Sequence, residues 1–170
     1  KIMDADFEGQ KQGTLMIEPF IASISIENLT FTYDGTPKKP HVTIEPEGLA
    51  FDLTFNDSSS APIHVGEYQV EVRITEPGYQ GQASKTMTIQ PAIAKLSVVN
   101  LNSKYDGAEK PVLVSTEPTG IAVEILYNGK NTAPSNAGNY PVKVTVIDPN
   151  YTGSVSDTLS ISKATANLFI

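Results

Sequence analysis

The feature that most constrains this chain is an internal repeat. Residues 22–92 and residues 94–164 align without a gap, and matching positions are separated by 72 residues. Self-similarity at a fixed period indicates one structural module that recurs along the chain. We therefore expect two copies of one domain, a first unit (residues 22–92) and a second unit (residues 93–164). The shared motifs are Tyr-Asp-Gly, Glu-Pro-x-Gly, Ala-Pro, Gly-x-Tyr and Pro-x-Tyr-x-Gly.

The repeat register continues into both ends of the chain. Residues 1–21 align with the end of a unit, and residues 165–170 align with the beginning of one. We expect the former to be the tail of a preceding unit and the latter to be the start of a following unit. A tail of this size is too short to bury a core of its own. Leu15 and Ile17 should therefore seek cover at a sheet edge of the first unit or on another molecule.

Apolar and polar residues alternate within each unit, and that period is typical of β-strands. The clearest run is 68–74, which recurs at 140–146. Shorter runs lie at 24–26, 42–44, 51–55 and 87–89 and at their equivalents, and no stretch has a helical period with caps. The pattern predicts an all-β chain of two tandem immunoglobulin-like β-sandwich modules, each with six or seven short strands, joined by a short linker. A β-grasp fold is the alternative, but it needs a crossover helix that the sequence lacks.

A specific signature precedes the longest alternating run. Gly66 and Tyr68 in the first unit, and Gly138 and Tyr140 in the second, lie where immunoglobulin-like domains carry a tyrosine corner. We expect both tyrosine hydroxyls to bond to upstream backbone and both rings to contact the core. Pro141 lies inside the same run, so the side of the strand that lacks its N–H should face solvent or a bulge.

The Tyr-Asp-Gly tripeptide is the other repeated signature. It comprises Tyr33, Asp34 and Gly35 in the first unit and Tyr105, Asp106 and Gly107 in the second. Each copy contains an aspartate that could act as a ligand residue in a binding site. We favour a turn instead, because aspartate bonds to nearby backbone there and glycine adopts a positive φ.

The sequence contains no recognisable catalytic constellation. It has no cysteine, which excludes thiol nucleophiles and disulfides. His41 and His64 align with a leucine and an asparagine in the second unit, so we expect two surface imidazoles. The segment 4–9 begins like a calcium loop, but Leu15 stands where the bidentate glutamate is needed. We expect no catalytic, metal-binding or cofactor-binding residue, and no enzyme.

Charge and hydropathy narrow the choice of partners. The net charge of −7 argues against nucleic acid, which is bound through Lys and Arg at the phosphates. The first unit carries a net charge of −5 and the second a net charge of zero, so the units do not share an electrostatic binding site. No apolar run approaches the roughly 18 residues of a membrane span.

Together these motifs resemble a known family. The Tyr-Asp-Gly tripeptide, the Ala-Pro segment followed by Gly-x-Tyr, the Asp-Pro-Asn-Tyr-x-Gly turn and the closing Ile-x-Lys-Ala are similar to the YDG/MBG-type repeats of bacterial extracellular proteins. The resemblance implies a tandem immunoglobulin-like module of a secreted or cell-surface, adhesin-like protein. Its expected partners are neighbouring repeat units of the same protein, and no catalytic residue or cofactor is transferred.

Two functions are open at this stage. The first is a rod-like spacer, because the linker over residues 90–95 has no glycine and Pro91 restricts its backbone. Ile93 is apolar, so we expect it to pack between two units that sit end to end. The alternative is a module that recognises a glycan or a host surface protein. For that alternative Tyr79 and Tyr151 are the candidate contacts, although we favour rings that plug the end of each sandwich.

Overall fold

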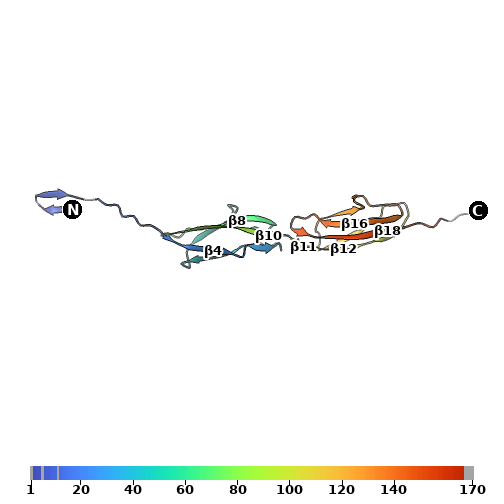
Figure 1. The fold of residues 1–170 in the computed structure, drawn as a ribbon, viewed down its shortest axis with the longest axis horizontal. Helices are drawn as coiled ribbons and strands as arrows, with labels where there is room; N and C mark the ends of the chain where they lie inside the picture. The colour runs from blue at the N-terminus through green and yellow to red at the C-terminus, as the bar shows by residue number, and fades with distance from the viewer. Residues whose placement is uncertain (1, 5, 11, 167–170) are drawn as a thin grey trace, which may run out of the picture.

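The computed structural model describes residues 2–4, 6–10 and 12–166. Its two units lie end to end along the long axis, and no helix occurs in the described ranges (Figure 1). Each unit has a separate apolar core. The predicted all-β fold of two tandem sandwich modules is confirmed. Within the described ranges, no helix has the length and hydropathy needed to cross a membrane.

The first unit packs a two-stranded sheet against a four-stranded sheet. In the small sheet, β4 (Ser23–Glu27) pairs antiparallel with β6 (His41–Glu45). The larger sheet has the order β5 (Thr30–Thr32), β10 (Gln82–Gln90), β8 (Gly66–Ile74) and β7 (Phe51–Phe55). Only the β5–β10 pair in this sheet is parallel. The core forms because inward positions of both sheets are apolar, and five of them are at most 1% exposed: Ile26, Val70, Val72, Met87 and Ile89.

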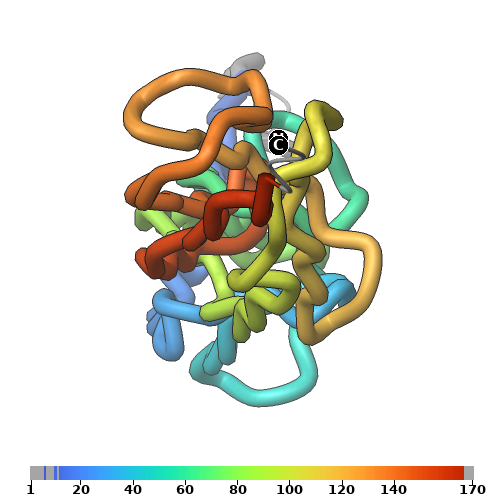
Figure 2. The backbone as a smooth tube through the Cα atoms, turned by 90° about the vertical axis from the view of Figure 1, so that its right-hand side faces the viewer, coloured from blue at the N-terminus to red at the C-terminus, as the bar shows by residue number. Residues whose placement is uncertain are grey.

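The second unit repeats this topology at the 72-residue register. Its small sheet is β12 (Lys95–Val99) with β14 (Leu113–Glu117). Its larger sheet has the order β13 (Asn102–Lys104), β18 (Ser154–Ser162), β16 (Gly138–Val146) and β15 (Val123–Tyr127). Figure 2 looks along the long axis, and the two units overlap in that view because one follows the other.

The Gly-x-Tyr signature forms a tyrosine corner in both units. The Tyr68 hydroxyl donates to the His64 carbonyl at 2.8 Å, and the Tyr140 hydroxyl donates to the Asn136 carbonyl at 3.0 Å. Both rings pack against the core of their unit. A Cβ atom on Gly138 would lie 3.3 Å from the Tyr140 ring, which explains why the motif begins with glycine.

Pro141 lies in a central strand, yet it breaks no ladder bond. Its register equivalent, Gln69, donates its N–H to the Asn56 side chain, past the end of β7. Proline at position 141 therefore forfeits only that side-chain bond. Its carbonyl still accepts from the Asn128 N–H at 2.7 Å.

The described residues of the segment before the first unit contribute to neither core cluster. A hairpin of β1 (Ile2–Asp4) and β2 (Phe7–Gly9) is followed by residues 12–19, which lie in no strand. Leu15 and Ile17 are 84% and 86% exposed. Residues 12–19 therefore add no strand to a sheet edge of the first unit.

A short segment flanks the repeat at each end. β3 (Phe20–Ile21), which the sequence assigns to the preceding tail, pairs in parallel with β9 (Tyr79–Gln80) of the first unit. At the other end, Thr165 and Ala166 are exposed and lie in no strand. The rest of the predicted segment 165–170 lies outside the described residues.

At one pair of positions in the two cores, both residues of the pair differ between the units. The Tyr127 hydroxyl accepts from the Val112 N–H at 2.9 Å, and both residues are buried. At the same register the first unit has Phe55 and Pro40, also both buried. Proline has no N–H and phenylalanine has no hydroxyl, so each unit carries a combination that leaves nothing unpaired.

Tyr127→Phe should therefore lower the free energy of unfolding of the second unit by about 1–3 kcal/mol, because a buried N–H loses its acceptor. Adding Val112→Pro removes that donor and should recover part of the loss. Urea unfolding followed on second-unit amide signals gives the double-mutant cycle. A double variant no more stable than Tyr127→Phe alone would contradict this pairing.

Candidate functional site at the junction between the units

The linker is a strand of the second unit rather than a tether. β11 (Ala92–Ile93) pairs in parallel with β17 (Tyr151–Thr152). The Ala94 N–H then donates to the Thr152 carbonyl at 2.9 Å. Since β10 ends at Gln90 and β12 begins at Lys95, almost the whole connection is held by backbone pairing.

The prediction that Ile93 packs between the units is wrong. Its side chain is 81% exposed, whereas Ala94 is 5% exposed. Successive side chains of a strand point to opposite faces, so the pairing that turns the alanine inward turns Ile93 outward. The close approach also requires Gly153, since a Cβ there would lie 2.8 Å from the Ala94 carbonyl oxygen. This contact explains the glycine of the repeated Pro-x-Tyr-x-Gly turn.

Four side chains meet across the junction. The rings of Tyr33 and Tyr151 lie edge to face, with centroids 5.3 Å apart and an interplanar angle of 83°. His64 stacks on Tyr33 with centroids 6.4 Å apart. The Asn150 side-chain oxygen accepts from the Val65 N–H at 3.1 Å and lies 3.4 Å from Nδ1 of His64. The end of the first unit and a turn of the second thus form one contact.

The Tyr-Asp-Gly tripeptide positions Tyr33 for this contact. The Tyr33 N–H donates to the Gln90 carbonyl at 2.8 Å, which ties the tripeptide to the end of β10. Gly35 has a φ of 79°, and Oδ1 of Asp34 accepts from the Thr36 N–H at 2.9 Å. The tripeptide is therefore the turn that its sequence predicts. Asp106 accepts from the Ala108 N–H at 3.0 Å, and Gly107 has a φ of 85°, so the second copy is the same turn.

A lysine locks each of these turns. Nζ of Lys38 donates to the Asp34 carboxylate, and the Lys38 N–H donates to the Pro62 carbonyl at 2.9 Å. Lys110 makes the equivalent contacts with Asp106 and Pro134. The repeated Ala-Pro segment is thus the anchor of the Tyr-Asp-Gly turn.

Asn150 is positioned by its own turn. Its N–H donates to Oδ1 of Asp148 at 2.8 Å, and the Tyr151 N–H donates to the Asp148 carbonyl at 3.1 Å. The first unit has Gly78 at this register, with a φ of 82°, so its turn has a different backbone and carries no side-chain acceptor. Sequence analysis did not single out Asn150, because the residue is not repeated.

The sequence-based candidates take these places in the structure. Tyr151 lies in the junction, and Tyr79 lies against Phe20 with ring centroids 5.9 Å apart. His64 is exposed, as predicted, but its ring also contacts the junction, which its isolated place in the sequence did not reveal. Tyr105, the register equivalent of Tyr33, is 40% exposed.

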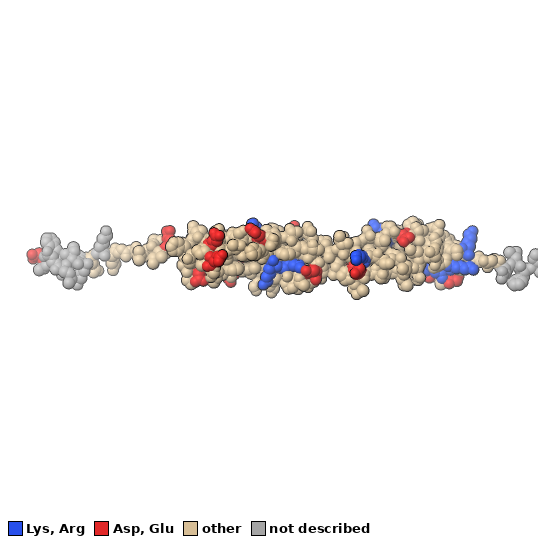
Figure 3. Space-filling view, turned by 90° about the horizontal axis from the view of Figure 1, so that it is seen from below, with Lys and Arg blue, Asp and Glu red and all other residues tan. Residues whose placement is uncertain are grey.

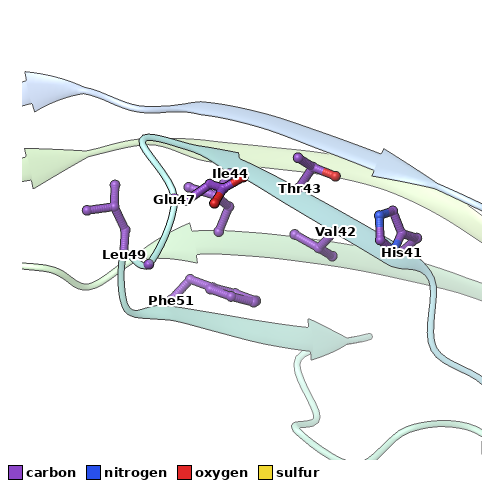
Figure 4. Close-up of a pocket in the computed structure, with 8 residues that line it drawn as sticks. His41, Val42, Thr43, Ile44, Glu47, Leu49 and Phe51 are labelled. Atoms are coloured by element: carbon purple, nitrogen blue, oxygen red, sulfur yellow. The ribbon is translucent and has the colours of Figure 1, made fainter.

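A second candidate is a shallow apolar groove on one side of the first unit, between β6 and β7 (Figure 4). Val42, Ile44, Leu49 and Phe51 contribute its apolar lining, and His41 also borders it. Within the described ranges, no three His, Cys, Asp or Glu residues gather to hold a metal ion. Of the repeated motifs, only the Glu-Pro-x-Gly turn borders the groove, through Gly48, whereas the junction uses three of them, so the junction is the stronger candidate.

Charge is not concentrated on the face that Figure 3 shows. Acidic and basic side chains are scattered along both units there. The ion pair of Lys95 with Glu117, at 3.2 Å, is exposed on both sides and thus contributes little. The contacts that hold the junction are the backbone pairing of β11 with β17, the Tyr33–Tyr151 ring pair and the hydrogen bond to Asn150.

Comparison with known proteins agrees with the repeat. The sequence model of one family, the MBG domain, matches the chain twice, over residues 22–93 and 94–165. The boundary between the two matches falls at the end of β11. No curated protein matches the chain.

The contact between Lys38 and Asp34 in the Tyr-Asp-Gly turn lowers the pKa of the aspartate. Hydrogen bonds from Lys38 and then Thr36 lower the pKa of Asp34 to about 2. The unfolded value is about 3.9, so this group favours the folded state above pH 4, and its contribution is lost as the pH falls through the folded pKa.

In a carbon-detected NMR titration, Asp34 should titrate near pH 2, and Lys38→Met should move its midpoint upward. Lys110→Met is the matched control, because it should raise the midpoint of Asp106 and leave that of Asp34 unchanged. An Asp34 midpoint near 4 in the unmodified protein would show that the hydrogen bond from Lys38 to Asp34 does not form in solution.

Proposed function

Because the chain belongs to the MBG domain family and carries two of its domains in tandem, we propose that it is a rod-like spacer. In this proposal the array is non-enzymatic and belongs to an adhesin-like protein at a bacterial surface, where it separates other parts of that protein. The observation that carries the proposal is the junction, in which the linker is absorbed into the second unit's sandwich.

The junction supports stiffness through three kinds of contact. The parallel pairing of β11 with β17 holds the linker backbone on the second unit. The Tyr33–Tyr151 ring pair opposes bending on one side. The bond from the Val65 N–H to Asn150 joins a loop of the first unit to a turn of the second. Bending therefore has to break contacts rather than rotate free bonds.

The repeated architecture supports a role in spanning distance. Units that sit end to end add length in proportion to their number (Figures 1 and 3). The residues that repeat are those that build the sandwich, the Tyr-Asp-Gly turn and the Pro-x-Tyr-x-Gly turn. Net charge, by contrast, differs between the units. That distribution is expected when the shape of each unit matters more than a shared surface.

The alternative of a ligand-binding module has less support. Its candidate contacts were Tyr79 and Tyr151, as platforms on which sugars stack. Each ring instead lies against another aromatic ring, Phe20 in one case and Tyr33 in the other. Both rings are half-buried.

Distance measurements between the units test the spacer. The chain has no cysteine, so Asp52→Cys and Glu124→Cys introduce unique spin-label sites at equivalent exposed positions. Pulsed electron resonance should give one narrow distance distribution. Tyr151→Ala with Asn150→Gly should broaden it, since an aromatic pair contributes about 0.5–1.5 kcal/mol and a hydrogen bond about 1 kcal/mol.

Tyr79→Ala is the matched control, because it removes the equivalent ring at the opposite end of the first unit and should leave the distribution unchanged. A broad distribution in the protein without junction substitutions would refute the rod and the spacer with it.

A further inference from the structure

The C-terminal end of the second unit has the same form as the half of the junction that the first unit supplies. A hollow there is lined by Tyr105, Ala137, Lys163 and Ala164. In the 72-residue repeat these residues are equivalent to Tyr33, Val65, Pro91 and Ala92, which lie at the existing junction. Tyr105 is 40% exposed, whereas Tyr33 is half-buried.

The surrounding loops are already in the conformation that the occupied junction uses. The Tyr140 hydroxyl donates to the Asn136 carbonyl at 3.0 Å, as Tyr68 does to His64. The Lys110 N–H donates to the Pro134 carbonyl at 2.9 Å. A face that is formed before its partner arrives loses little conformational freedom on docking.

One donor on this face has no acceptor within the described ranges. At the existing junction the Val65 N–H donates to Asn150 at 3.1 Å. Ala137 stands at the same register, and no bond from its N–H occurs among residues 12–166. Docking that covered this N–H without an acceptor would leave it unpaired away from water, which is unfavourable.

The two N-terminal faces in this chain differ in what they could offer to that donor. The second unit presents Asn150 beside Tyr151. The first unit presents Gly78 beside Tyr79, so it offers the ring without the side-chain acceptor. Backbone pairing, such as the bond from the Ala92 N–H to the Asn150 carbonyl at 3.0 Å, needs no particular side chain and so does not discriminate.

We propose that the C-terminal end of the second unit is a docking face for a further MBG domain, selective for one whose turn reads Pro-Asn-Tyr-x-Gly. The asparagine of that turn makes docking selective, because its side-chain oxygen is the acceptor for the Ala137 N–H. The tyrosine supplies edge-to-face contact with Tyr105. The glycine of that turn allows the backbone of residues 164–166 to approach closely, as Gly153 does for Ala94. This inference rests on the proposed spacer function and adds a rule for which domains can follow one another.

Two extended chains test the selectivity. In one, residues 1–165 are followed directly by a copy of residues 94–165; in the other, they are followed by a copy of residues 22–93. Both keep the 72-residue register, and both bring a tyrosine to the face. Amide hydrogen exchange of Ala137 is the readout. It should be about tenfold slower with the appended second unit than with the appended first unit, as expected for one net hydrogen bond.

The Val65 N–H is the internal reference, and Asn150→Ala in the appended copy alone is the matched variant. That variant should return Ala137 to fast exchange while Val65 stays protected. Equal protection of Ala137 in both extended chains would overturn the selectivity, and fast exchange in both would overturn the docking face. Fast exchange of Val65 itself would instead refute the existing junction and the spacer proposal beneath it.

Discussion

The parallel pairing of the linker with β17 is the interaction on which the rest of the arrangement depends. It converts the four-residue connection between β10 and β12, residues 91–94, into part of the second sandwich. The pairing demands glycine at position 153, turns Ala94 inward and leaves Ile93 exposed. Because β17 begins at Tyr151, directly after Asn150 in the turn, the same pairing places both side chains against the first unit.

The Tyr-Asp-Gly turn serves both the unit and the junction. Within the unit, Asp34 and Lys38 join it to the loop that carries the Ala-Pro segment. Across the junction, the same turn holds Tyr33 where the next unit's tyrosine meets it. The same motif therefore stabilises a loop within its own unit and positions the tyrosine that contacts the next unit.

Sequence analysis predicted elements whose cause is local or periodic. Alternation located the strands around 68–74 and 140–146, and the Gly-x-Tyr pattern located the tyrosine corner. It missed β5, because three residues carry too little pattern, and it shortened β10, whose segment 82–86 is mainly polar. It also misjudged Ile93, because the orientation of a linker side chain depends on a strand that lies far along the chain. Asn150 escaped notice, since the first unit has Gly78 at the same register and the asparagine is therefore not part of the repeat.

By itself the sequence determined the number of units, their all-β class and the two repeated turns, because repetition, alternation and positive-φ glycines are properties of the chain alone. Only the tertiary structure decided how the units meet. The parallel partner of the linker, the ring that Tyr151 contacts and the donor that Asn150 satisfies are all set by segments brought together across a domain boundary. Such contacts depend on distance and direction in space, and a one-dimensional pattern records neither.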